Sequence, residues 1–221
     1  MFNFVQGQLV SIAVIIFILG LIYQGIQFFK LTKKKEWVFP PSPVQNKSEK
    51  KTAEQWMTQC LRSLNGTLWE TDRVLTIVTS VFHICLIAAP LFLLGHNILL
   101  DQSWGLNLFS LPESFSDVLT LVVLICGAYF IGRRLFLVRV RAITTAYDYL
   151  ILLIAIAPFL TGYFAYHQWF DYDAVMTLHL LAGEVMLIMI PFTKLGHMLF
   201  FFLYRFFIGN EYSFVRGSRT W

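Results

Sequence analysis

Five long apolar stretches alternate with shorter polar segments along the chain. They lie near residues 8–29, 74–99, 117–137, 145–166 and 174–204, and each has at least the length of about 20 residues that a helix needs to cross a bilayer. The ten-residue alternation of a membrane-spanning strand does not occur in the sequence, and lipid leaves unpaired backbone groups no partner. The pattern therefore predicts an all-α membrane protein, a bundle of five transmembrane helices forming one domain over residues 1–221.

The composition agrees with a membrane protein. Hydrophobic residues make up 57% of the 221 residues, charged residues make up 14%, and the mean hydropathy is +0.64, which excludes an ordinary soluble domain. The three cysteines, Cys60, Cys85 and Cys126, have neither disulfide-framework nor CxxC spacing, and no CxxCH haem-attachment motif occurs. We recognise no internal repeat, phosphate-binding loop or nucleophile elbow, so the sequence gives no support to a hydrolase, and we expect no nucleic acid partner.

Basic residues mark one side of the predicted bundle. All 17 Lys and Arg residues fall between the first and second spans, at the connection between the third and fourth, or at the inner end and in the tail of the fifth. Segments 1–7, 100–116 and 167–173 contain none. By the positive-inside rule we expect the N-terminus outside, the C-terminus in the cytoplasm, and a location in the cell inner membrane. The cytoplasmic loop of about 30–73 is then a tether, a lipid contact or a docking surface.

Four of the five histidines lie inside two apolar stretches, His83 and His96 in the second and His179 and His197 in the fifth. An imidazole at bilayer depth costs free energy unless something binds it. Because these two spans run in opposite directions, we expect His83 beside His197 near the cytoplasm and His96 beside His179 near the outer face. The 18 residues from His179 to His197 (197 − 179) make about five helical turns, so a continuous helix presents both on one face. The pattern predicts two haem b groups, with these four histidines as the metal ligands.

The second span fits this geometry less simply. The 13 residues from His83 to His96 (96 − 83) correspond to a rotation of about 220° in an ideal helix, and Pro90 between them is expected to kink the span and re-aim one histidine. The competing interpretation is that the histidines are hydrogen-bonding groups between helices. A zinc site is disfavoured because it gathers four ligands, and these pairs lie far apart in depth. We expect His167 to be an interfacial residue.

Haem propionates are anionic and need partners at each site. For the inner haem the candidates are the basic residues Lys194, Arg133, Arg134 and Arg205. Lys194 is the best placed by sequence, three residues before His197, although a lysine there also suits snorkelling towards the headgroups. For the outer haem, where no basic residue is available, the candidates are the neutral donors Trp104, Tyr163, Tyr166 and Asn97. We expect Asp148 to pair with Arg139 or Arg141.

A quinone site needs an apolar slot beside a haem and a few polar groups that exchange protons. Gly95 leaves space next to the outer ligand, and the polar candidates at that end are Asn97, Glu113 and Tyr166, together with Asp117 and His167. We therefore predict a menaquinone pocket near His96. Glu184, an ionisable residue inside the fifth span, is either a proton relay or a structural carboxyl.

The segment from His179 to Arg205, HLLAGEVMLIMIPFTKLGHMLFFFLYR, resembles the last span of the respiratory nitrate reductase gamma family. The Gly183-Glu184 pair and the tail GNEYSFVRGSRTW are more similar to the TmcC- and DsrM-type membrane subunits of sulfate reducers. The resemblance implies a b-type dihaem cytochrome with axial ligands on the second and fifth spans and a quinol site by the outer haem. It also implies electron exchange between menaquinone and a cytoplasmic iron-sulfur subunit like that of heterodisulfide reductase, with a periplasmic multihaem cytochrome c as a further partner.

Two other functions stay open at this point. The main interpretation is an electron-transfer subunit of an oxidoreductase complex, without catalytic residues of its own. The first alternative is a haem-free membrane anchor whose histidines are packing groups. Within electron transfer, a hydrogenase or formate dehydrogenase cytochrome b is disfavoured by the five-span layout and the Pro-Phe-Thr-Lys-Leu segment.

Overall fold

A computed structural model describes residues 5–33, 72–106, 108–197 and 200, and every regular element within them is helical. The elements, in chain order, are the π-helical turn η1 (Val5–Leu9), α2 (Val10–Lys33), α5 (Arg73–Phe92), α6 (Leu94–Trp104), α7 (Glu113–Phe136), α8 (Val138–Arg141), α9 (Ala146–Tyr166), α10 (Tyr172–Phe192) and the 3-10 turn η2 (Lys194–Gly196). Five helices, α2, α5, α7, α9 and α10, are long and apolar enough to cross a membrane. The prediction of an all-α, multi-pass membrane protein is confirmed for the described residues.

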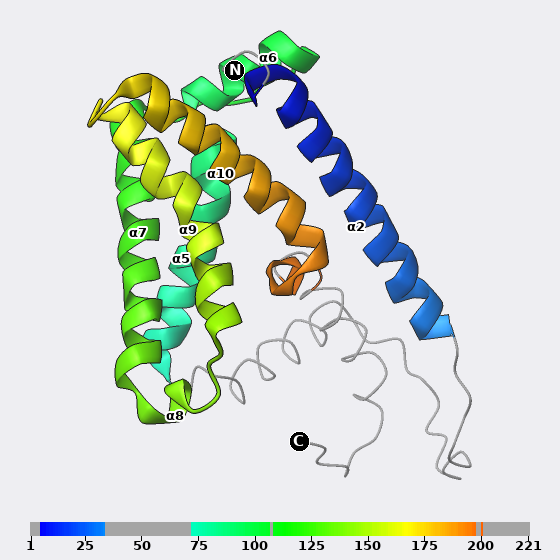
Figure 1. The fold of residues 1–221 in the computed structure, drawn as a ribbon, viewed down its shortest axis with the longest axis vertical. Coiled ribbons are helices and arrows are strands. Elements are labelled where there is room, and N and C mark those ends of the chain that lie inside the picture. The colour runs from blue at the N-terminus through cyan, green and yellow to red at the C-terminus, as the bar shows by residue number, and fades with distance from the viewer. Residues whose placement is uncertain (1–4, 34–71, 107, 198–199, 201–221) are drawn as a thin grey trace, which may run out of the picture.

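The helices pack side by side in an order that differs from their order in the sequence. Helix α2 packs against α10, α10 against α9, α9 against α7, and α7 against α5 (Figure 1). Helix α2 thus stands at one edge of the assembly, and the short α8 closes the turn between α7 and α9 (Figure 1). The second and fifth spans, which carry the four histidines, run in opposite directions.

Charge is divided between the two ends of the bundle. The basic end carries Arg73, Arg133, Arg134, Arg139, Arg141 and Lys194, and the acidic end carries Asp101, Glu113, Asp117, Asp171 and Asp173. An aspartate caps a helix at each end, because Asp72 Oδ1 accepts from Leu75 N and Asp171 Oδ2 accepts from Ala174 N, both at 3.0 Å. These caps satisfy backbone N–H groups that have no partner inside the helix.

The buried core lies where α5, α7 and α9 meet. Its members are mostly apolar and of mixed size, namely Phe82, Cys85, Leu86, Ala89, Val123, Cys126 and Phe159. Gly127 brings α7 close to α9, since a Cβ at this position would lie 2.4 Å from Ile156 Cδ1. Small residues serve this purpose in membrane helices, where close packing stabilises helix association.

Two of the five spans are broken near a proline. Helix α5 ends at Phe92, Leu93 is extended, and α6 begins at Leu94, which agrees with the bend expected from Pro90. Helix α10 ends at Phe192 just after Pro191, and Thr193 is extended, with φ −127° and ψ −176°. The predicted continuous helix over 174–204 is therefore wrong, as is the argument that it presents both of its histidines on one face. Proline breaks the ladder because it has no N–H to donate.

Two predicted features lie outside the described residues. They are Arg205 and nearly all of the cytoplasmic loop of about 30–73, of which the structure describes only the first and last few residues.

Candidate functional site

The four histidines form two pairs, each joining the second span to the fifth. The rings of His83 on α5 and His197 after η2 have centres 5.8 Å apart and planes at 85°. The rings of His96 on α6 and His179 on α10 have centres 6.0 Å apart and are nearly parallel, at 16°. The first pair lies at the basic end and the second lies towards the acidic end. The structure thus places side by side the histidines that the antiparallel spans were expected to bring together.

A short internal repeat underlies this arrangement and corrects the expectation that the chain has none. Residues 90–96 read PLFLLGH and residues 191–197 read PFTKLGH, so both fit Pro-x3-Leu-Gly-His. In each segment the helix ends just after the proline, two residues on at Phe92 and one residue on at Phe192. Each pair consequently combines one histidine before the break in its span, His83 or His179, with one that lies six residues after a proline, His197 or His96. The repeat is the sequence signal that predicts both breaks.

The ring nitrogens show which tautomer each histidine adopts. In all four, Nδ1 faces a backbone carbonyl: Thr79 O at 2.7 Å from His83, Pro90 O at 2.9 Å from His96, Pro158 O at 2.9 Å from His179, and Lys194 O from His197. A carbonyl only accepts, so Nδ1 carries the hydrogen, and in the neutral imidazole Nε2 then keeps its lone pair. This is the usual arrangement for a metal-bound histidine, whose second nitrogen donates to a carbonyl or carboxylate.

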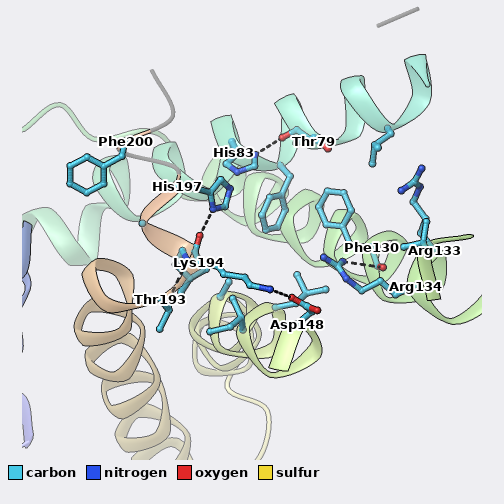
Figure 2. Close-up of a pocket in the computed structure, with 18 of the residues that line it drawn as sticks. Thr79, His83, Phe130, Arg133, Arg134, Asp148, Thr193, Lys194, His197 and Phe200 are labelled. Carbon is cyan, nitrogen blue, oxygen red and sulfur yellow. Dashed lines mark hydrogen bonds and ion pairs between the residues drawn. The ribbon is translucent and has the colours of Figure 1, made fainter. Parts of the chain in front are cut away.

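A cavity of about 810 Å³ lies around the pair at the basic end and contains His83 and His197 in its lining. Its volume is within the range of about 300–1,000 Å³ typical of ligand and cofactor sites. The rings of Phe82 and Phe130 meet edge to face at 5.2 Å and form part of an apolar wall. Figure 2 shows the two histidines at one side of this cavity, with the cationic side chains nearby.

Three cations line this cavity, and two of them are already paired. Arg133 Nη2 lies 2.7 Å from Asp72 Oδ2. Lys194 Nζ lies 2.7 Å from Asp148 Oδ1 (Figure 2). Asp148 therefore pairs with Lys194, and the expectation of a bond to Arg139 or Arg141 was wrong. Arg134 donates to the carbonyl of Phe130 at 3.4 Å and has no carboxylate partner among the described residues.

The Asp72 carboxylate serves both as a helix cap and as an ion-pair partner. The Leu75 amide and then the Arg133 guanidinium hold the pKa of Asp72 below its usual range, although partial desolvation opposes them. Asp72 is thus a carboxylate at neutral pH, and its negative charge is paired with the Arg133 guanidinium.

The pair towards the acidic end is held by packing against α9. A Cβ at Gly162 would lie 3.0 Å from His179 Cε1, so this glycine makes room for the imidazole. Thr161 Oγ1 lies 3.4 Å from His179 Nδ1, whose carbonyl partner belongs to Pro158. Sequence reasoning missed Pro158, Thr161 and Gly162, because nothing in one helix tells which turn of another helix it will contact.

The predicted quinone residues do not share one environment. A Cβ at Gly95 would meet nothing within 4 Å, so there is open space beside His96. Asn97, by contrast, is buried, and its amide donates to Ser110 Oγ at 2.8 Å and to Phe109 O at 3.2 Å. The structure therefore gives Asn97 a role in fixing the loop before α7. The other predicted members, Glu113 and Tyr166, are exposed at the acidic end.

Two further ionisable residues of the spans were singled out in the sequence. His167 Nε2 lies 3.1 Å from Asp117 Oδ1 and belongs to neither histidine pair. Glu184 is buried within α10, and neither of its carboxyl oxygens has a hydrogen-bond partner in the described part of the chain. Groups of three or more histidine, cysteine or acidic residues placed to hold a metal are not found among the residues that the structure describes.

Fold and site together define a multi-pass helical membrane protein with two cross-helix histidine pairs. A protein of Nitratidesulfovibrio vulgaris strain Hildenborough is 40% identical to this chain over 152 residues, which cover 69% of the chain and 67% of that relative. The chain belongs to the family of that protein, whose recorded name is simply "Protein". No protein-family model matches the chain, and no solved structure matches it.

Proposed function

We propose that the chain is a b-type dihaem cytochrome, an electron-transfer subunit of a membrane oxidoreductase complex. The observation that carries the proposal is the two histidine pairs, in which every Nδ1 faces a backbone carbonyl, so that Nε2 of the neutral imidazole is the nitrogen available to a metal. Hydrogen bonding between helices alone does not require all four rings to adopt this tautomer.

The spacing of the rings fits a metal held between them. A bond from a metal to an imidazole nitrogen is about 2 Å long, so two imidazoles on opposite sides of one metal have ring centres roughly 6 Å apart. The observed separations of 5.8 Å and 6.0 Å match this value. Haem, when bound, supplies a one-electron redox centre, and two axial histidines leave no open position for a substrate. The role of the chain is then to place and tune two redox centres.

The depths of the two pairs suit electron transfer across the membrane. A hydrocarbon core about 30 Å thick is too wide for one centre, whereas one centre towards each side divides the distance. At the basic end, Arg134 is the cation best placed to bind a propionate, because its neighbours Arg133 and Lys194 are occupied by carboxylates. At the acidic end, where segments 100–116 and 167–173 contain no Lys or Arg, propionates would be bound by neutral donors such as Trp104, Tyr163 and Tyr166.

The charge division supports an orientation and a set of partners. We place the protein in the cell inner membrane, with its basic end in the cytoplasm and its N-terminus outside. A cytoplasmic iron-sulfur subunit would then dock on the basic end, where Arg139 and Arg141 are exposed on α8. Menaquinone would bind beside Gly95, in the open space next to His96. A periplasmic multihaem cytochrome c is a further partner of the opposite face.

Haem content tests the proposal directly. The purified full-length chain should contain two b-type haems, measured as the haem-to-protein ratio with a reduced-minus-oxidised spectrum. Replacing one member of a pair, as in His83→Ala or His179→Ala, should remove one haem each. His167→Ala is the matched control and should keep both, because His167 is bonded to Asp117 and lies outside the pairs. A wild-type chain free of haem would leave only the membrane-anchor function.

The quinone site has its own test. Gly95→Leu fills the space beside His96 and should abolish haem reduction by a menaquinol analogue while the haem spectrum stays intact. Gly25→Leu, which also enters open space but lies on α2, a helix that carries no histidine, serves as the control. Unchanged reduction kinetics in Gly95→Leu would place the quinone elsewhere.

A further inference from the structure

We infer that Gln24, on the first membrane span, is a positioning residue for His197 and so tunes one histidine pair and not the other. The inference rests on the proposed function, since its readout is the haem bound by that pair. The hydrogen bonds around the break in the fifth span include one from α2, a helix that carries no histidine.

The break leaves the carbonyl of Pro191 without its helical partner. In a continuous helix this oxygen would accept from the N–H of Leu195, four residues on. Here Leu195 N donates instead to Thr193 Oγ1, at 3.2 Å. Gln24 Nε2 takes the vacant place and donates to Pro191 O at 2.8 Å. A buried carbonyl without a partner costs free energy, so this bond from α2 stabilises the broken conformation.

Helix α2 comes close enough to make this bond because of Gly20. A Cβ at Gly20 would lie 2.6 Å from Pro191 Cγ and 3.1 Å from Phe192 Cζ, so any larger residue would push the helices apart. Gly20 and Gln24 are one turn apart and share a face of α2. The glycine thus seats Pro191 against α2, and the glutamine binds the carbonyl of the same residue.

The contact is transmitted to His197 over a short, packed segment. Gln24 and His197 both line the cavity at the basic end. Between Pro191 and His197, Gly196 is buried, and a Cβ there would lie 3.0 Å from the carbonyl oxygen of Ile190. His197 then bonds to Lys194 O within the η2 turn. A shift of the Pro191 carbonyl therefore has little room to relax before it reaches the imidazole.

The other break lacks this external contact. There the carbonyl of Pro90 accepts from His96 Nδ1, at 2.9 Å, so the histidine itself occupies the vacant acceptor. A change at Gln24 should consequently leave the pair of His96 and His179 unaltered. This selectivity separates a positioning role from a general loss of stability.

The test compares Gln24→Leu with Gln27→Leu in the purified full-length chain. Gln27 is the matched control, because it lies on the same helix and donates within that helix, to Tyr23 OH at 3.0 Å. We expect Gln24→Leu to retain both haems, to change the low-spin electron paramagnetic resonance signal of one, and to shift its reduction equilibrium about tenfold, or about 59 mV for one electron. The second haem and the Gln27→Leu protein should be unchanged. If Gln24→Leu does not accumulate, Gly20→Ala carries the same expectation.

The outcomes separate the inference from the proposed function. Equal shifts of both haems, no shift of either, or the same shift in Gln27→Leu would overturn the positioning role while leaving a dihaem cytochrome. A wild-type chain without haem would instead overturn the proposed function, and that result is obtained before any variant is made.

Discussion

The two Pro-x3-Leu-Gly-His segments have the same spacing and different surroundings. In both, the helix ends within two residues after the proline, and the histidine follows six residues after it. The carbonyl released at Pro90 accepts from His96, whereas the one released at Pro191 accepts from Gln24 of another helix. The motif therefore marks the turn in which each span breaks, and tertiary contacts decide how each broken segment is held.

The two histidine pairs also differ in how their surroundings are built. His83 and His197 face a cavity of about 810 Å³ with three cations in its lining. His179 is instead packed against α9 at Gly162 and bonded to a carbonyl of that helix. Charge therefore distinguishes the basic-end pair, and close packing distinguishes the other.

The sharpest way to break this comparison is to remove the packing at Gly162. A leucine there would overlap the His179 ring, because even a Cβ would lie 3.0 Å from it. We expect Gly162→Leu to lose the haem proposed for that pair, so that the haem-to-protein ratio falls from two to one. The haem proposed to lie between His83 and His197 should keep its spectrum.

The control for this change is a glycine with free space around it. Gly25, on α2, has nothing within 4 Å of its Cβ position, so Gly25→Leu should retain both of the proposed haems. Two haems in Gly162→Leu, or loss of the basic-end haem alone, would contradict the assignment of packing to the His179 pair.

The sequence predicted the spans and the pairing but not the means by which the pairs are held. Hydropathy was sufficient for the five membrane-spanning helices, because a bilayer sets one length and one polarity for each. Opposite chain directions were sufficient to match His83 with His197. The break at Thr193 was missed because the apolar run continues through it, although Pro191 and the repeated motif marked the position. Contacts such as Gln24 with Pro191 join residues 167 positions apart, and no local pattern specifies them.

Charge at the basic end gives the second prediction. Replacing Arg134 removes a cation that has no carboxylate partner among the described residues, so adding an electron nearby becomes less favourable. We expect Arg134→Gln to lower the reduction potential of the haem proposed at the basic end by roughly 59 mV, a tenfold change in its equilibrium. Arg133→Gln should lower it less, because Asp72 already neutralises Arg133 at 2.7 Å. A redox titration in which Arg133→Gln lowers the potential more than Arg134→Gln does would show that Arg133, and not Arg134, is the cation that acts on this site.

The third prediction concerns Glu184, which lies in the middle of α10, between the two histidine pairs. Its carboxyl is buried, and its two oxygens lack partners among the described residues. Because an unsatisfied buried polar group costs about 1–3 kcal/mol, Glu184→Leu should stabilise the protein by about 1 kcal/mol. Thermal unfolding in detergent measures the change, with Glu184→Gln as the variant that keeps polarity and should gain less. A destabilised Glu184→Leu protein would reveal that the carboxyl has a bound partner.

The smallest expected effect compares the aspartate caps at the two ends. Asn caps helices as well as Asp does, so both variants keep the cap. Asp72→Asn removes the ion pair with Arg133. Asp171→Asn removes no ion pair shown by the described residues. A lowered pKa in the folded state means that the Asp72 charge stabilises the protein at neutral pH, and that this contribution is lost as the pH falls from about 4 through the lowered pKa. We therefore expect Asp72→Asn to lower the thermal midpoint at pH 7 more than Asp171→Asn does, and to approach the wild type as the pH is lowered. A difference that is independent of pH would show that the Asp72 carboxylate acts through shape and not through its charge.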